Sequence, residues 1–162
     1  LSCLPEVRRV KKLILGLLVV ASLSVASAQG RLFGEVLSGE LQLVPSFGLS
    51  AAVTAGAERL LGPLDLRGGL ALSAGGGGAV FALGADVLYP IPLEGLSLDL
   101  GGGLQLRTGN PTVFGLRGIV GLEFPLQRDF SLRVEAQPTI FFGGGGSEFN
   151  LSLVFGPRVY FR

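Results

Sequence analysis

The sequence predicts an all-β fold: an eight-stranded antiparallel up-and-down transmembrane β-barrel, preceded by a cleaved signal peptide. Beyond residue 28, eight runs alternate large apolar residues with small or polar ones at a two-residue period, and short turns rich in Gly, Pro, Asn or Asp separate them. Charged residues make up only 15% of the 162-residue chain, whereas an average soluble domain has roughly 25%. The last run, residues 148–162, is long enough to cross a bilayer as a tilted strand, which takes roughly 9 to 11 residues.

Residues 1–28 have the pattern of a secretory signal peptide. A basic group (Arg8, Arg9, Lys11 and Lys12) precedes an apolar run from Leu13 to Val25, and Ala26-Ser27-Ala28 matches the small-residue pattern before a cleavage point at Gln29. The apolar run is short of the roughly 18 residues that a spanning helix needs. We expect residues 1–9 to be a misannotated start, with translation beginning at Val10. Residues 29–162 then form the barrel.

The first four expected strands show the alternation with local irregularities. They cover residues 31–37, 41–58, 64–73 and 81–89. Ser38-Gly39 is the expected turn between the first two, and Pro45 predicts a bulge or an extension beyond the membrane. We expect the fourth strand to stop at Pro90-Ile91-Pro92.

The last four expected strands are more regular. They cover residues 96–107, 114–124, 130–142 and 148–162. Thr108 to Pro111 is a turn by composition, and Pro125 to Asp129 is expected to turn the chain again. Pro138 predicts a local irregularity within the seventh strand.

Each expected strand has one face of large apolar residues and a second face of small or polar residues. The composition of this second face decides which side points inward. Gly, Ala, Ser and Thr dominate it, with scattered Asp, Glu and Arg, whereas a soluble surface would carry many long charged residues. An eight-stranded barrel is just wide enough for side chains to fill, so small residues leave room there for a few charged ones. Leu, Phe and Val then coat the outside, and no charged strand residue meets lipid.

The expected lumen charges are the only candidate functional constellation in the sequence. They are Glu35, Asp65, Arg67, Asp86, Asp99, Arg117, Glu123, Arg133, Glu135 and Arg158. Acidic and basic side chains at a similar depth in the barrel predict a plug held together by salt bridges. The alternative is that the same residues line a narrow polar path.

The residue content argues against several functional classes. The chain has no histidine, and its one cysteine, Cys3, precedes the expected cleavage point. We therefore expect no enzyme, no cofactor and no metal site. Residues 29–162 contain no lysine and are slightly acidic, so no nucleic-acid partner is expected. The glycine runs 75–78 and 143–146 lack the Lys-Ser or Lys-Thr of a phosphate-binding loop.

With eight strands, an apolar outside, a polar inside and an aromatic terminus, the chain resembles the small outer-membrane barrels of the OmpA and OmpX type. Its last residues are similar to the C-terminal signal of such barrels, with Gly156, Val159 and Phe161 at the glycine, hydrophobic and aromatic positions. The resemblance implies a bacterial outer-membrane location and contact with outer-membrane lipid. During biogenesis it implies the secretory translocon and the barrel-assembly machinery as partners.

We expect a structural or envelope-maintenance role for such a barrel. An even strand number puts both termini on the periplasmic side, so the connections after the odd strands would be external. They are short, which argues against an adhesin or receptor. The alternatives are a narrow channel for small solutes and, less favoured, a soluble secreted barrel that binds a hydrophobic ligand. The sequence leaves the oligomeric state open.

Overall fold

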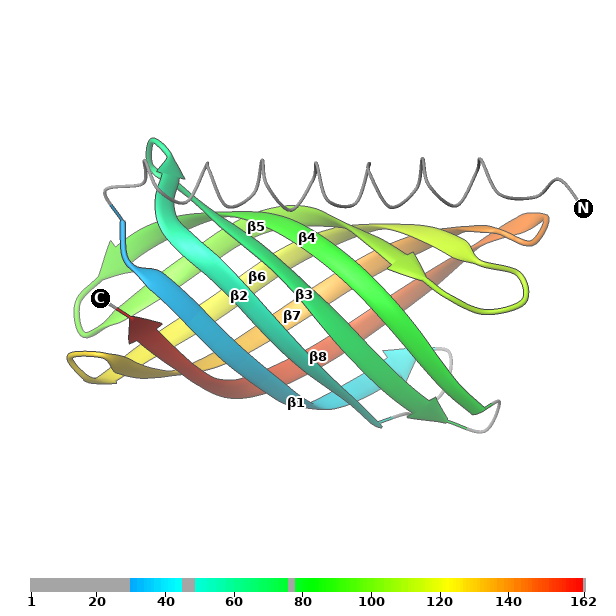
Figure 1. The fold of residues 1–162 in the computed structure, drawn as a ribbon, viewed down its shortest axis with the longest axis horizontal. Helices are drawn as coiled ribbons and strands as arrows, with labels where there is room; N and C mark the ends of the chain where they lie inside the picture. Colours follow the sequence, from blue (N-terminus) through cyan, green and yellow to red (C-terminus); the bar gives the residue numbers. More distant parts are fainter. Residues whose placement is uncertain (1–29, 45–48, 76–77, 162) are drawn as a thin grey trace, which may run out of the picture.

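In the computed structural model, which describes residues 30–44, 49–75 and 78–161, eight antiparallel strands close into a barrel (Figure 1). The strands are β1 (Leu32–Val44), β2 (Leu49–Leu61), β3 (Leu64–Gly75), β4 (Gly78–Leu93), β5 (Leu96–Arg107), β6 (Val113–Gln127), β7 (Phe130–Gly143) and β8 (Gly146–Phe161). Each strand pairs with its sequence neighbours, and β1 pairs with β8 to close the ring. The predicted all-β, eight-stranded fold is confirmed.

Both ends of the barrel wall lie at the same end of the molecule. The first residue of β1 and the last residue of β8 are at the left in Figure 1, together with the β2–β3, β4–β5 and β6–β7 hairpins. We call this the terminal end. The opposite end, which carries the hairpins after the odd-numbered strands, is the distal end. The distal β7–β8 turn is tight because Gly144 and Gly145 adopt positive φ angles of 65° and 90°, which other residues rarely adopt.

The expected boundary between the first two strands is wrong. Ser38-Gly39 is not a turn, because β1 continues to Val44 and β2 begins at Leu49. Along this segment β1 shifts its register against β8 twice, between Ser38 and Leu41 and between Gln42 and Val44. Such bulges carry extra residues past the partner strand, so a composition typical of a turn is accommodated within a strand. Pro45 lies outside the described residues.

Two proline-containing segments also extend strands that were expected to end earlier. β4 continues through Pro90 and Pro92 to Leu93, and β6 continues through Pro125 to Gln127. Beyond Leu88, β4 pairs only with β5, because its other neighbour, β3, does not extend past this point. This part of β4 is an edge, where a missing backbone N–H removes no ladder hydrogen bond.

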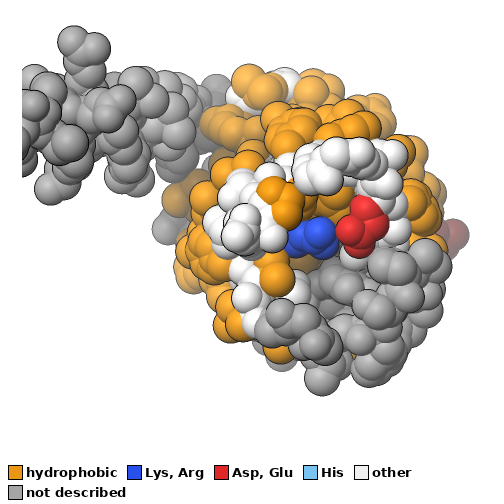
Figure 2. Space-filling model, turned by 90° about the vertical axis from the view of Figure 1, so that its right-hand side faces the viewer, with side chains coloured by type: hydrophobic (Ala, Val, Ile, Leu, Met, Phe, Trp, Pro, Cys, Tyr) orange, Lys and Arg blue, Asp and Glu red, His pale blue; other side chains and the backbone are white. Residues whose placement is uncertain are grey.

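Side chains sort by face as the alternation predicts. Leu, Val, Ile and Phe side chains cover the outside of the wall and remain exposed, for example Val53, Leu116 and Phe155. Figure 2 views the barrel from its distal end, where a largely hydrophobic outer surface surrounds a hollow in which basic and acidic side chains are visible. No helix in the described part of the chain is long and apolar enough to span a membrane.

Candidate functional site in the barrel lumen

All ten charged residues singled out from the sequence point into the lumen. Nine of them are buried, and the side chain of Arg117 is 13% exposed. Every strand except β2 contributes at least one of them. They occupy mainly the half of the lumen near the terminal end, because most lie within a few residues of the strand ends that meet there. The buried groups therefore form a layer across the barrel.

Arg67 is the centre of this layer. Its Nη1 and Nη2 donate to the two carboxylate oxygens of Glu135 at 2.6 and 3.0 Å, a bidentate pair. Nη1 also donates to Glu35 at 2.9 Å, and Nε donates to Asp86 at 3.0 Å. One guanidinium thus joins carboxylates from three strands, β1, β4 and β7.

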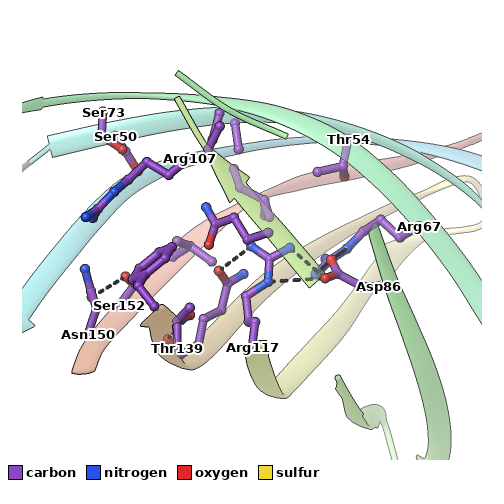
Figure 3. Close-up of a pocket in the computed structure, with 18 residues that line it drawn as sticks. Ser50, Thr54, Arg67, Ser73, Asp86, Arg107, Arg117, Thr139, Asn150 and Ser152 are labelled. Atoms are coloured by element: carbon purple, nitrogen blue, oxygen red, sulfur yellow. Dashed lines mark hydrogen bonds and ion pairs between the residues drawn. The ribbon is translucent and has the colours of Figure 1, made fainter. Parts of the chain in front are cut away.

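Arg117 closes the layer on its distal side. Its Nη2 and Nε donate to Asp86 Oδ1 at 2.6 and 3.2 Å, and its Nη1 donates to Gln137 at 3.2 Å (Figure 3). Asp86 is therefore shared between Arg67 and Arg117. Gly103 makes room for this contact, because a Cβ at that position would lie 2.0 Å from Asp86 Oδ1.

Arg133 and Arg158 extend the layer toward the terminal end. Arg133 Nη1 lies 2.6 Å from Asp99 Oδ2, and its Nε contacts Glu135. Arg158 contacts Glu35 and donates from Nη1 to Glu123 at 2.7 Å. Carboxylates and guanidiniums alternate across the lumen, so we name this set the plug: Glu35, Arg67, Asp86, Asp99, Arg117, Glu123, Arg133, Glu135 and Arg158.

Neutral side chains complete the plug, and the sequence analysis did not single them out. Thr54 donates to Glu35 at 2.7 Å, Ser131 donates to Glu123 at 2.6 Å, and Gln137 donates to Glu135 at 2.7 Å. The Tyr160 hydroxyl also donates to Glu123. All four residues occupy lumen-facing positions of the alternating pattern, and this is the signal by which the sequence could have identified them.

Apolar side chains also enter the lumen, which the face assignment overlooked. Phe33, Leu88 and Ile119 are at most 2% exposed and share the inward parity of their strands. The ring of Phe33 lies 4.2 Å from the guanidinium carbon of Arg158, a cation–π contact. These side chains fill space between the charged groups.

Open space remains on both sides of the plug. On the distal side a cup of about 60 Å³ is lined by hydroxyl and amide side chains, including Ser73, Asn150 and Ser152, and reaches down to Arg117 (Figure 3). This volume suits a few water molecules. At the terminal end, adjoining cavities of about 420 and 300 Å³ share the lining residues Glu58, Asp65, Pro90, Pro92 and Ser97. We call these two cavities the vestibule.

Ion pairs of lower burial lie at both rims. At the terminal rim Arg31 Nε donates to Glu58 at 3.1 Å. Partial burial lowers the pKa of Arg31, but the hydrogen bond and charge of Glu58 outweigh it, so this pKa is raised. At the distal rim Arg107 lies 3.5 Å from Glu148. These pairs are solvent-screened, so they contribute less than the buried contacts.

Asp65 is the one charged residue of the predicted set that the structure does not join to the plug. Its Oδ1 accepts a hydrogen bond from the backbone N–H of Arg59 at 2.8 Å. Among the described residues it forms no ion pair. Arg59 has a φ of 53°, a backbone conformation unusual for a residue other than glycine, and the contact with Asp65 holds this bend.

The three residues of the expected assembly signal lie on β8 where it pairs with β1. Gly156 faces the lumen, and a Cβ there would lie 1.9 Å from the carbonyl oxygen of Val36. Val159 and Phe161 are exposed on the outside, opposite Gly34 and Leu32. The described residues contain no group of three or more Asp, Glu, His or Cys side chains that could hold a metal ion.

Comparison with solved structures identifies this architecture. The β-barrel domain of Pseudomonas aeruginosa OprF superposes with a TM-score of 0.64 at 11% identity, covering 82% of this chain and 100% of that one. The chain has the fold of the small outer-membrane barrels. The predicted resemblance to the OmpA and OmpX type is thereby confirmed at the level of fold.

Two further structures agree with this fold. Neisserial surface protein A superposes with a TM-score of 0.62 at 14% identity, covering 82% of this chain and 96% of that one. A major outer membrane protein from Thermus thermophilus has a TM-score of 0.57 at 19% identity, covering 82% of this chain and 100% of that one. No protein-family model and no curated protein sequence matches the chain.

Proposed function

We propose that the protein is an integral outer-membrane barrel with a structural or envelope-maintenance role and without enzymatic activity. The observation that carries this proposal is the plug, a layer of ion-paired guanidiniums and carboxylates, such as Arg67 and Glu135, that closes the lumen. Because side chains close the lumen, we assign the function of the protein to the barrel wall and its outer surface. The apolar outer surface suits contact with outer-membrane lipid, because lipid-facing charges would be costly.

The connections at the distal end support a structural role over recognition. The β3–β4 and β7–β8 strands are separated by residues 76–77 and 144–145 only, and the β5–β6 connection spans residues 108–112. Surface receptors and adhesins depend on longer loops that form a binding surface. In our proposal these short connections face outward from the cell.

A narrow channel is the second candidate, and one observation favours it. The distal cup and the terminal vestibule approach the plug from both sides, so the paired side chains are the barrier between two solvent-accessible spaces. A soluble barrel for a hydrophobic ligand is disfavoured, because Arg67, Arg133 and Glu135 occupy the lumen where that ligand would bind.

Two measurements test the proposal. Cell fractionation should place the protein in the outer membrane, with unboiled and boiled samples migrating differently on a gel, as folded barrels do. Reconstitution into planar bilayers should then give no discrete conductance steps. Steps in the wild-type protein would favour the channel, and recovery in the soluble fraction without detergent would contradict both membrane proposals.

A further inference from the structure

The outer wall of the barrel is hollowed by a groove of about 680 Å³ that crosses the strands from β3 to β8. Its floor contains Ala85 on β4, Gly102 on β5 and Gly118 on β6, and Gly102 and Gly118 are direct cross-strand partners. Asp86 and Arg117 also border the groove, but their side chains point into the lumen, where they pair with each other. The surface of the groove is therefore apolar.

Large apolar side chains form the two sides of the groove. Leu104, Leu116 and Ile140 are consecutive cross-strand partners and lie on its distal side. Val87 lies on the opposite side, two residues from Ala85 toward the terminal end. The floor is thus a slot one residue wide along each strand, between rows of large side chains.

The groove belongs to the part of the wall that faces lipid. It rises from Leu66, near the terminal end of β3, to Phe149, near the distal end of β8. It is continuous with the exposed Leu, Val and Phe side chains of the outer surface. Among the described residues that line it, no charged or hydroxyl side chain points toward the groove, so its occupant is apolar.

The width of the slot selects among apolar occupants. On β5 the floor residue Gly102 lies between Leu100 and Leu104, whose Cα atoms are four residues apart, or about 13 Å along the strand. The two leucine side chains take up much of this distance, and a helix with its side chains is about 10–12 Å across. A second barrel would present a curved wall that enters the slot only with single side chains. A hydrocarbon chain is narrow enough to lie along the floor.

Packing favours such a chain in the groove over one on the open wall. A chain in the groove contacts the floor and both sides, whereas a chain on the convex wall contacts one side only, and each further atom contact adds dispersion attraction. The volume is also in the roughly 300–1,000 Å³ range of small-molecule sites. We propose that the groove binds one acyl chain of a membrane lipid, and binds it more tightly than the rest of the wall does.

This inference rests on the membrane placement in the proposed function and deepens the contact with lipid that it includes. The groove offers no polar group to a lipid headgroup. It therefore distinguishes lipids by the hydrocarbon chain and not by the headgroup.

Single tryptophans test the proposal, because the chain contains none of its own. Ile140→Trp places the probe at the side of the groove, and Val53→Trp places it on the outer wall of β2, outside the groove and at a similar distance from the distal end. The folded full-length protein in maltoside micelles is titrated with a dibrominated phosphatidylcholine, whose acyl chains quench tryptophan on contact. We expect saturable quenching of Ile140→Trp, about twofold or more stronger than that of Val53→Trp at the same lipid content.

Filling the groove should remove this difference. Gly102→Leu in the Ile140→Trp background should lower the quenching to the value of Val53→Trp. Ala51→Leu is the matched control, because it enlarges an exposed small residue of β2 outside the groove, and it should leave the quenching unchanged. The gel mobility of unboiled samples shows whether each variant is folded, and Ala85→Leu fills the same floor if Gly102→Leu does not fold.

Equal quenching at the two tryptophans would overturn the proposal, as would strong quenching that persists in the filled variants. A dimer that is lost in the filled variants while the quenching stays unchanged would assign the groove to a second copy of the chain, and would overturn it too. Cell fractionation tests the membrane placement separately, so its failure can be told apart from these results.

Discussion

Arg133→Met tests whether the plug stabilises the barrel as a connected unit. Arg133 is fully buried, and its Nη1 lies 2.6 Å from Asp99, for which it is the one ion-pair partner among the described residues. Methionine keeps most of the side-chain volume, so little of the loss comes from a cavity. Removing one member of a buried ion pair typically costs about 3–5 kcal/mol, because the other charge remains buried. We expect a loss of that size in the free energy of unfolding.

The assay is urea unfolding in lipid vesicles, followed by the mobility difference between folded and unfolded protein. Arg107→Met is the matched control, because Arg107 and Glu148 are 3.5 Å apart and 28% and 46% exposed. A pair this exposed is worth about 1 kcal/mol or less. Adding Asp99→Asn to Arg133→Met should recover part of the loss. A loss no larger than that of the control would refute the connected plug.

Three further predictions concern the wall and the end of the chain. Val120→Arg, in the middle of β6 on the outer face, should lower the free energy of unfolding in vesicles by about 2–4 kcal/mol. Leu126→Arg, near the strand end, should lower it by about 1 kcal/mol or less. Equal losses would contradict the membrane placement. Gly103→Ala should lower the free energy of unfolding by about 1–3 kcal/mol, because its methyl group would overlap Asp86 of the plug. Gly102→Ala, which faces outward, should be nearly neutral. The reverse order would contradict the lumen geometry. Deleting Tyr160 to Arg162 should reduce the amount of folded barrel in the membrane fraction far more than deleting the last residue alone, and similar yields would argue against an assembly signal at this end.

The alternation was sufficient to predict the fold and the direction of most side chains. A period of two residues assigns each strand residue to one face, and the small residues of one face identified it as the lumen. Arg67 and Arg133 were placed inward on that basis alone. The same parity applies to Leu88 and Ile119, which were overlooked because their apolar character suggested the outer face.

The partners within the plug could not be predicted from the sequence. Arg67 and Glu135 are 68 positions apart and meet across the lumen, so their contact depends on the stagger of every strand between them. The alternation assigns each residue to the inner or the outer face, but it does not determine how far each strand is shifted along its neighbour. The extent of β1 was missed for a related reason, because Ser38 and Gly39 have the composition of a turn, and only the pairing with β8 shows a bulged strand there.

The bulged pairing of β1 with β8 has a consequence for how the chain reaches its folded state. Every other strand pair joins segments linked by a few residues, whereas Leu32 pairs with Phe161, which is 161 minus 32, or 129, positions later. Closing a loop of that length costs about 3 kcal/mol more in chain entropy than closing a four-residue turn. We therefore expect the hairpins to form before the ring closes. The fidelity of this closure depends on two bulges that determine which residue of β1 meets which residue of β8.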